Sequence, residues 1–389
     1  MHPAPDIVWI VTTQWRAQAC GFAGDVNART PGLDALAAGA GDFAEAVTPH
    51  PFGPFARAAL LTGVPSPANG VADYWDALPD DAPTVAHVLN KRGYTTAFVG
   101  KWGVGRRDRA LPLVGEEAAR ALVPPESRGG FGWWSGFEGG FQLNDPWLHG
   151  DGRPAPERVA GYQSDVLVDE AVAWWRRTAT AGACPRFLLL SLEAPHPPYG
   201  AAVPEGITRP RPEDIVLAPN VPRGGDAEAR ARRELAGYYA HIAATDRALG
   251  RWFAETQAGE TRPAVTVFTS VHGDMHGAHG LFRKGWPHEE SVRVPLLVAG
   301  WPGRPGGWRS REAVSLSDLP AMTLAWADGR DWRCPRDHAE ISMPCVVALP
   351  DQCDRVWRGV RRPGGAKSLV DADGAPWILA EGGPNCRPV

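Results

Sequence analysis

Histidine and aspartate crowd into a short stretch that follows an apolar segment. His272, Asp274, His276 and His279 lie within eight residues, directly after residues 264–269, whose apolar run predicts a buried strand. An ordinary pKa of about 6.5 makes imidazole suitable for proton transfer. A zinc site and a set of hydrogen-bonded loop histidines are the alternatives, although the spacing is not that of a closed zinc site. We predict catalytic roles for His272, Asp274 and His276.

Lysine is rare enough for each one to be informative. The chain has 40 basic residues, and only Lys91, Lys101, Lys284 and Lys367 are lysines. This bias towards arginine makes each lysine a candidate for a specific role, such as gripping an anion. His288 and Glu289 follow Lys284 closely and extend the set of candidate proton-transfer groups.

Alternating apolar strands and amphipathic helices organise most of the chain. We expect strands at residues 7–12, 95–99, 187–192, 264–269 and 294–298, and helices at 31–40, 84–92, 166–177 and 234–253. This alternation is typical of an α/β layered domain with a mainly parallel sheet. We assign residues 1–316 to that domain, which would carry the pocket.

The remaining segments have a different pattern. Residues 122–150 and 199–226 are rich in Pro and Gly without periodicity, which predicts long ordered loops of the kind that shape ligand sites. Residues 317–389 predict a small C-terminal subdomain with antiparallel strands. We place those strands at 356–360, 368–371 and 377–380.

Composition excludes several classes of partner. A formal net charge of -4 with no basic stripe argues against nucleic acid and against an anionic membrane surface. No apolar stretch approaches the roughly 20 residues that span a bilayer, and the N-terminal residues predict no secretory leader. We therefore expect a cytoplasmic protein. Its six cysteines favour reduced thiols, although Cys334, Cys345 and Cys353 are close enough for a bridge.

Several blocks resemble the sulfatase branch of the alkaline-phosphatase superfamily, in the order of that family. They are residues 6–14, the opening strand; 30–34, TPGLD; 57–63, RAALLTG; 93–102, GYTTAFVGKW; 194–199, APHPPY; and 268–274, FTSVHGD. Residues 279–284 and 290–295 continue the series. The resemblance implies an alkaline-phosphatase-like layered α/β fold with a mainly parallel central sheet and a smaller antiparallel subdomain.

The metal positions of that family have changed in this chain. The resemblance implies that a metal, usually calcium, would be held at the positions of Thr13, Gln14, Val271 and His272. Calcium prefers hard oxygen ligands, above all carboxylates, and none of these four residues has a carboxylate. We predict no metal and no other cofactor.

The nucleophile of the family is missing as well. In sulfatases it is a cysteine oxidised to formylglycine, and the matching residue here is Gly53. Gly103 stands where the family has the histidine that assists the nucleophile. The resemblance therefore implies that the hydrolytic mechanism of the family is lost.

The anion-binding positions, by contrast, match the family. Arg57, Lys101, His196 and Lys284 fall where sulfatases grip the sulfate group, and cations that converge on one oxyanion form strong hydrogen bonds. Thr13 and Gln14, at the vacated metal positions, complete the predicted substrate-binding set. Structural roles, such as capping by Arg57, are the alternative.

Two functions fit this selective pattern. In the first, the chain binds a sulfate ester of a small organic substrate and an internal nucleophile displaces sulfate at carbon, closing a ring such as an aziridine. Elimination is a variant, phosphate esters would suit the same logic, and natural-product biosynthesis is the expected setting. In the second, the chain is a non-catalytic homologue that binds a sulfated or phosphorylated ligand or supports a partner enzyme. Hydrolysis with a different metal is a third alternative. A hetero-oligomer with a pathway partner is compatible with each.

Overall fold

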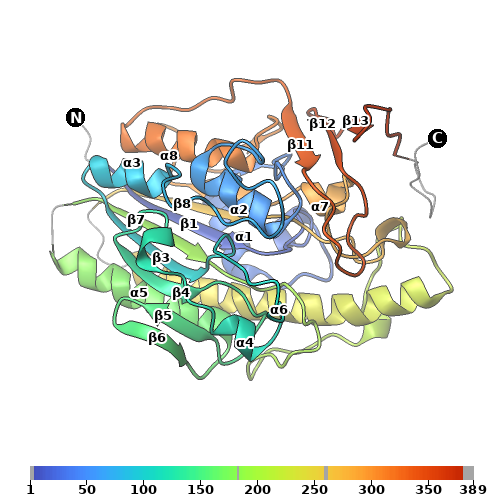
Figure 1. Cartoon of the computed structure of the whole chain (residues 1–389), viewed down its shortest axis with the longest axis horizontal. Helices are drawn as coiled ribbons and strands as arrows, with labels where there is room; N and C mark the ends of the chain where they lie inside the picture. The colour runs from blue at the N-terminus through green and yellow to red at the C-terminus, as the bar shows by residue number, and fades with distance from the viewer. Residues whose placement is uncertain (1–3, 182–183, 258–261, 380–389) are drawn as a thin grey trace.

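A ten-stranded sheet forms the centre of the molecule, seen in a computed structural model that describes residues 4–181, 184–257 and 262–379 (Figure 1). Its order is β10-β2-β9-β8-β1-β7-β3-β4-β5-β6. The five strands in the middle are parallel: β8 (Ala264–Ser270), β1 (Asp6–Thr12), β7 (Arg186–Ser191), β3 (Thr95–Lys101) and β4 (Trp133–Phe137). The outer strands are β9 (Leu296–Ala299), β2 (Ala40–Phe43), β5 (Trp147–Gly150), β6 (Arg153–Arg158) and β10 (Arg309–Ser310).

Helices cover both faces of this sheet (Figure 1). One layer contains α1 (Pro31–Gly39), α5 (Gln163–Ala181) and α6 (Asp226–Gln257), and the other contains α2 (Gly53–Thr62), α3 (Val85–Lys91) and α8 (Leu319–Ala327). Strand β1 is buried throughout. Between Asp6 and Thr12 its side chains are all apolar, because successive side chains enter opposite layers. Ile7, Trp9 and Val11 pack towards α2, while Val8 and Ile10 pack towards α6.

A second, antiparallel sheet lies at one end of the molecule. It consists of β11 (Ala339–Met343), β12 (Trp357–Arg361) and β13 (Lys367–Asp371). Trp357 and Met343 belong to the same core cluster as the α2 layer. Arg361, only 2% exposed, forms ion pairs of 2.8 Å with both Glu45 and Glu289. The small sheet is therefore packed on the main layers, although the division at residue 316 remains a prediction.

The predicted fold class is confirmed, and the central strands and the long helices lie close to their predicted positions. Two predictions of local structure are wrong. Residues 122–150 contain β4 and β5 as well as loops. This Trp- and Gly-rich segment has no clear period, and it is ordered because β4 pairs with β3 and β5 pairs with β4. Residues 377–379 form no strand; an isolated bridge between Val370 and Pro376 precedes them. Residue 380 lies outside the described residues.

Two further expectations concern cysteines and membranes. Cys20, Cys184, Cys334, Cys345 and Cys353 are free thiols in the described structure, so the three clustered cysteines are not bridged to one another. Cys386 lies outside the described residues. None of the described helices combines the length and the apolarity that crossing a bilayer requires.

A buried ion pair fixes the starts of the two innermost strands. Asp6, at the start of β1, accepts hydrogen bonds from the backbone nitrogen of Arg186 at 2.7 Å and from its guanidinium at 2.5 Å. The side chains are 1% and 5% exposed. This pairing sets the register at which β1 and β7 reach their opposite ends, where the candidate site lies.

We expect Asp6→Ala to lower the free energy of unfolding by about 3–5 kcal/mol, because the Arg186 guanidinium would remain buried without its carboxylate. Urea unfolding followed by tryptophan fluorescence would measure the change. Asp214→Ala, which removes an exposed ion pair with Arg211, is the matched control and should leave the midpoint unchanged. Equal effects of the two substitutions would contradict this account.

Candidate functional site

The candidate site lies where the parallel strands reach their carboxyl ends, the usual ligand position in such sheets. Each of the five central strands contributes side chains at or just beyond its last residue. These are Thr13 and Gln14 after β1, Lys101 at the end of β3, Glu138 after β4, Glu193 and His196 after β7, and His272 after β8. Arg57 comes from the first turns of α2, and Lys284 comes from a loop.

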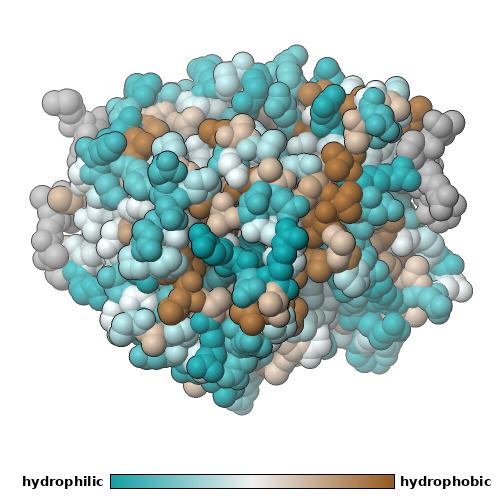
Figure 2. All heavy atoms as spheres, in the orientation of Figure 1, coloured by the Kyte–Doolittle hydropathy of each residue, from teal (hydrophilic) through white to brown (hydrophobic). Residues whose placement is uncertain are grey.

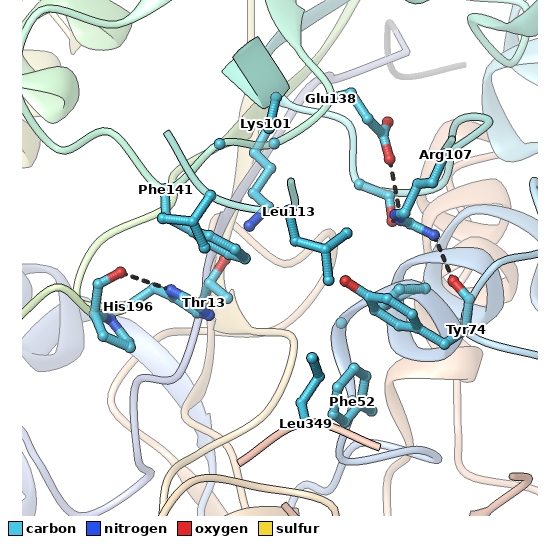
Figure 3. Close-up of a pocket in the computed structure, with 18 of the residues that line it drawn as sticks. Thr13, Phe52, Tyr74, Lys101, Arg107, Leu113, Glu138, Phe141, His196 and Leu349 are labelled. Carbon is cyan, nitrogen blue, oxygen red and sulfur yellow. Dashed lines mark hydrogen bonds and ion pairs between the residues drawn. The ribbon is translucent and has the colours of Figure 1, made fainter. Parts of the chain in front are cut away.

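A cavity of about 450 Å³ opens at this edge of the sheet (Figure 3). Seven of the predicted site residues line it: Thr13, Gln14, Arg57, Lys101, His196, His272 and Lys284. We call three cationic residues of this lining, Arg57, Lys101 and Lys284, the floor; Arg106, Arg107 and Arg283 also line the cavity. Asp274 and His276 are not among the lining residues; both are fully buried behind it.

Arg57 is held rigidly by the ends of three strands. Its Nη1 donates to Ser191 Oγ at 2.6 Å and to the Lys101 carbonyl at 3.2 Å, and its Nη2 donates to Thr13 Oγ1 at 2.7 Å. Burial lowers its pKa to about 10, which still leaves the guanidinium charged at neutral pH. Its Nε and one Nη2 hydrogen are not used in these bonds and can serve a ligand.

Lys101 is paired with a carboxylate that the sequence analysis did not single out. Its Nζ lies 2.5 Å from Glu193 Oε1, and the Glu193 side chain is fully buried. Burial lowers the pKa of Lys101 although Glu193 opposes the effect. The ammonium keeps two of its three hydrogens for a ligand. The position of Glu193 directly before the APHPPY block was the available signal.

Lys284 ends a chain of hydrogen bonds that begins at a buried aspartate. Asp274 Oδ2 accepts from Tyr199 Oη at 2.8 Å and from the side-chain nitrogen of Gln14. The Gln14 Oε1 thereby faces Lys284 and accepts from its Nζ at 2.6 Å. Gln14 has φ 68, an uncommon conformation for a residue other than glycine, so the network holds it under local strain. Asp274 therefore positions the floor from behind.

The third contact of Lys284 fixes its remaining hydrogen. His196 Nδ1 lies 2.9 Å from the Pro197 carbonyl, which can only accept, so its Nε2 accepts from Lys284 Nζ at 3.0 Å. With two hydrogens used by Gln14 and His196, the Lys284 ammonium has one left for a ligand. Burial and the Lys101 ammonium lower the pKa of Lys284 to about 7.

His272 lines the cavity and has a ring nitrogen that no protein group shares among the described residues. Its Nδ1 lies 2.8 Å from the Gly273 carbonyl, so Nδ1 carries the hydrogen and Nε2 has the lone pair. No hydrogen-bond partner contacts Nε2 among the described residues. Burial and the Lys284 ammonium hold the pKa of His272 well below its usual range. The ring is therefore neutral at physiological pH.

The other histidines of the cluster lie outside the cavity. His276 is fully buried, with its ring 4.3 Å from that of Tyr238. The rings of His279 and His288 lie 4.7 Å apart on another side of this loop, and Glu289 pairs with Arg361 at the small sheet. The structure thus brings only His272 of this group into contact with the cavity.

The residues at the family's metal positions do not fit a divalent cation. Gln14 Oε1 already accepts a hydrogen bond from the Lys284 ammonium, and Thr13 Oγ1 accepts one from Arg57. The side chain of Val271 has no atom that could bind a metal. A hard cation would meet two positive side chains and no carboxylate. Within residues 4–181, 184–257 and 262–379, no three His, Cys, Asp or Glu side chains form a group that could hold a metal ion.

The two glycines at lost catalytic positions differ in their surroundings. A Cβ at Gly53 would meet no atom within 4 Å, so the space of the lost nucleophile is open to the cavity. A Cβ at Gly103 would lie 2.8 Å from Arg57 Cδ, and Gly103 has φ 69. A histidine at position 103 would therefore require Arg57 to move. The present position of Arg57 depends on that glycine.

Aromatic and aliphatic side chains complete the cavity, and the sequence analysis did not identify them. Phe52, Tyr74, Leu113, Phe141 and Leu349 surround the floor (Figure 3). No tryptophan of the described residues lines the cavity; Trp134 and Trp301, for example, are buried in the core. The wall residues come from five separate segments, so no sequence pattern marked them.

Comparisons with known proteins identify the family of this chain. The family described as Sulfatase matches residues 5–329. An ulvan-active sulfatase of Formosa agariphila is 35% identical over 302 residues, which is 77% of this chain but only 56% of that relative. The choline-sulfatase of Rhizobium meliloti is 27% identical over 77% of this chain and 65% of its own length.

Solved structures share the fold. The putative sulfatase yidJ from Bacteroides fragilis superposes with a TM-score of 0.80 and 22% identity, covering 97% of this chain and 88% of that one. The fold defines an alkaline-phosphatase-like α/β protein. This chain belongs to the sulfatase family.

We expect the affinity for inorganic sulfate to fall as the pH rises through about 7, because Lys284 binds an anion only when protonated. A Lys284 pKa of about 7 predicts a roughly tenfold rise in Kd between pH 6 and pH 8. Isothermal titration calorimetry would measure Kd. Lys284→Met should bind weakly at pH 6 without this dependence, and the exposed Lys91→Met should match the parent protein. A pH-independent Kd in the parent would contradict the assignment.

Proposed function

We propose that this protein binds a sulfate ester of a small organic amine and releases sulfate by internal displacement at carbon. The amine of the substrate would close a ring, such as an aziridine, and natural-product biosynthesis is the setting that such a product suggests. The carrying observation is the combination of an intact cationic floor with an open space at Gly53. These observations support the proposal because the floor offers cations to the anion, whereas Gly53 has no side chain that could attack sulfur.

The floor is suited to a leaving sulfate. An alkyl sulfate monoester carries one negative charge and free sulfate carries two, so the extra charge develops on the oxygen that leaves carbon. Arg57, Lys101 and Lys284 still have N–H groups for a ligand after their contacts to the protein. Donors aimed at developing charge in a buried site favour the transition state over the bound ester.

The displacement balances without a protein nucleophile. The lone pair of the substrate amine attacks the carbon, the carbon–oxygen bond breaks, and its electron pair leaves with sulfate. As the new bond forms, the nitrogen gains positive charge and passes one proton to a base of the cavity in the same step. A cavity that holds amine and ester in line supplies the orientation that such a ring closure needs.

His272 Nε2 is the group that we assign to receive this proton. It has a lone pair, lines the cavity, and lies on the loop next to the floor. Its lowered pKa keeps it unprotonated before reaction, and proton transfer to bulk water would follow. Asp274 and His276, which we also predicted as catalytic, support the floor and its loop from behind in this proposal.

A binding protein without turnover is the second candidate function. The pairing of Lys101 with Glu193 favours it, because Glu193 neutralises part of the floor charge. A partly neutralised floor stabilises the additional charge of a leaving sulfate less strongly. Such a protein would hold a sulfated or phosphorylated ligand or act beside a partner enzyme in a hetero-oligomer. The experiments below separate the two functions.

We expect the purified protein to convert a 2-aminoalkyl sulfate into sulfate and a cyclic amine, with or without a chelator. In oxygen-18 water, the released sulfate should contain no solvent oxygen, because the bond that breaks joins carbon to oxygen. Mass spectrometry of the sulfate and of the organic product measures both. Arg57→Ala should abolish release, and Arg211→Ala, at an exposed position, should not.

Other outcomes would discriminate between the alternatives. Labelled sulfate would mean attack on sulfur and would contradict displacement at carbon. Label in an alcohol product would indicate water as the nucleophile. Sulfate binding that weakens in Lys101→Ala and Lys284→Ala, without any turnover, would establish the binding protein instead.

We expect His272→Gln to slow ring closure by about 100-fold or more while sulfate affinity changes little, because only the proton acceptor is removed. Single-turnover rates and calorimetric Kd values separate the two effects. His276→Gln, at a buried position away from the cavity, should keep its rate. A slow His276→Gln with a normal His272→Gln would overturn the assignment.

A further inference from the structure

The outer wall of the cavity is formed by one segment that crosses above the floor. We call residues 103–121 the strap. Its first part is fixed by Arg107, which donates to the Tyr74 carbonyl at 2.7 Å and the Gly103 carbonyl at 2.6 Å and pairs with Glu138 at 3.0 Å. Farther on, the Gly115 nitrogen donates to the Gly140 carbonyl at 3.0 Å. The strap is therefore anchored on both sides of Leu113.

Aromatic rings stand directly beside the ammonium groups of the floor. Lys101 Nζ lies 4.4 Å from the centre of the Phe141 ring, and Lys284 Nζ lies 5.4 Å from that of Phe52. Phe141 also stacks on His196, with ring centres 4.5 Å apart. Phe141 has φ 55, so these contacts hold it in an uncommon backbone conformation. The space next to the bound anion is thus bordered by apolar surface.

Above these rings, the wall remains apolar (Figure 3). Leu113 of the strap and Leu349, from the loop after β11, face the same space as Phe52 and Tyr74. Figure 2 shows hydrophobic atoms gathered on the molecular face beside the small sheet from which that loop comes. Aliphatic and aromatic surface therefore continues from the floor to the mouth.

Most polar side chains of the cavity outside the floor are engaged with the protein or placed at the mouth, and the Tyr74 hydroxyl and His272 Nε2 are the exceptions among the described residues (Figure 3). Glu138 accepts from the Gly105 nitrogen at 2.9 Å and pairs with Arg107, and Arg283 pairs with Glu234 at 2.6 Å. Arg106, Asp108 and Asp351 line the cavity but are solvent-exposed. Sugar hydroxyls at mid-depth would find few partners, and a buried hydroxyl without a partner weakens binding.

We infer that the organic part of the substrate is an apolar alkyl or aryl body rather than a sugar, and that Leu113 and Leu349 select it. This inference rests on the proposed function for its sulfate end only. A cavity of about 450 Å³ lies within the range of small-ligand sites. The sulfate group of the substrate lies against the floor, and the apolar body fills the space between the strap and the loop after β11.

Calorimetric titration with inorganic sulfate, methyl sulfate, butyl sulfate, hexyl sulfate and glucose 6-sulfate tests the inference. From methyl to butyl sulfate, each added methylene should tighten binding about two- to fourfold, because it leaves water for apolar surface. Glucose 6-sulfate should bind no more tightly than methyl sulfate. Leu113→Asn and Leu349→Asn should flatten the chain-length dependence. Leu122→Asn, an identical change at a residue 57% exposed and outside the cavity, should not.

The possible results distinguish this inference from the proposed function. Equal affinities for all the esters, or tighter binding of glucose 6-sulfate than of hexyl sulfate, would overturn the apolar selection while the sulfate grip stands. If 1-hexanol binds as tightly as hexyl sulfate and inorganic sulfate does not compete, the sulfate grip fails and the apolar wall remains. Absence of binding by every probe overturns both. Circular dichroism checks that each variant is folded, and the two wall variants test the same prediction independently.

Discussion

Burial of positive charge at the carboxyl edge of the sheet is the constraint on which the site depends. Arg57, Lys101 and Lys284 are each less than 9% exposed, and isolated charges at such depth are costly. Glu193 and Asp274, both fully buried, compensate most of that charge, the first directly and the second through Gln14. One positive charge remains in excess, which suits a monoanionic ester. Backbone oxygens and hydroxyls at the strand ends also accept from Arg57, and the N–H groups that remain are available for a ligand.

This compensation links the anion grip to the lost hydrolytic groups. Gln14 replaces a metal-binding carboxylate of the family, and its neutral amide joins Asp274 to Lys284. Gly103 replaces a histidine, and the absence of a Cβ lets Arg57 reach Ser191 and Thr13. Gln14 and Gly103 each permit a contact of the floor: the Gln14 amide oxygen accepts from Lys284, and the space at Gly103 holds the Arg57 side chain.

Apolar surface gives the same site its second property. Phe52 and Phe141 border the ammonium groups, and the strap closes the space above them. Exclusion of water strengthens each hydrogen bond from the floor to a bound anion. The same burial lowers the pKa of Lys284. We therefore expect the affinity of the floor for an anion to depend on pH near neutrality. The affinity, selectivity and pH dependence that we propose would thus have one physical origin.

The sequence by itself determined the layered α/β fold and the family. It also determined several residues that face the cavity, such as Arg57, Lys101 and Lys284, because they lie in blocks that resemble the family. Local apolar runs fix buried strands, and short motifs place residues at the strand ends, where parallel topology gathers them. Only the tertiary structure decided that His272 reaches the cavity while Asp274 and His276 lie behind it, because eight residues of irregular loop have no period from which direction can be read. Only the tertiary structure also assembled Glu193, Phe141, Leu113 and Leu349 around the floor. Their proximity results from long-range packing between segments that are far apart in the chain, and no local pattern encodes it.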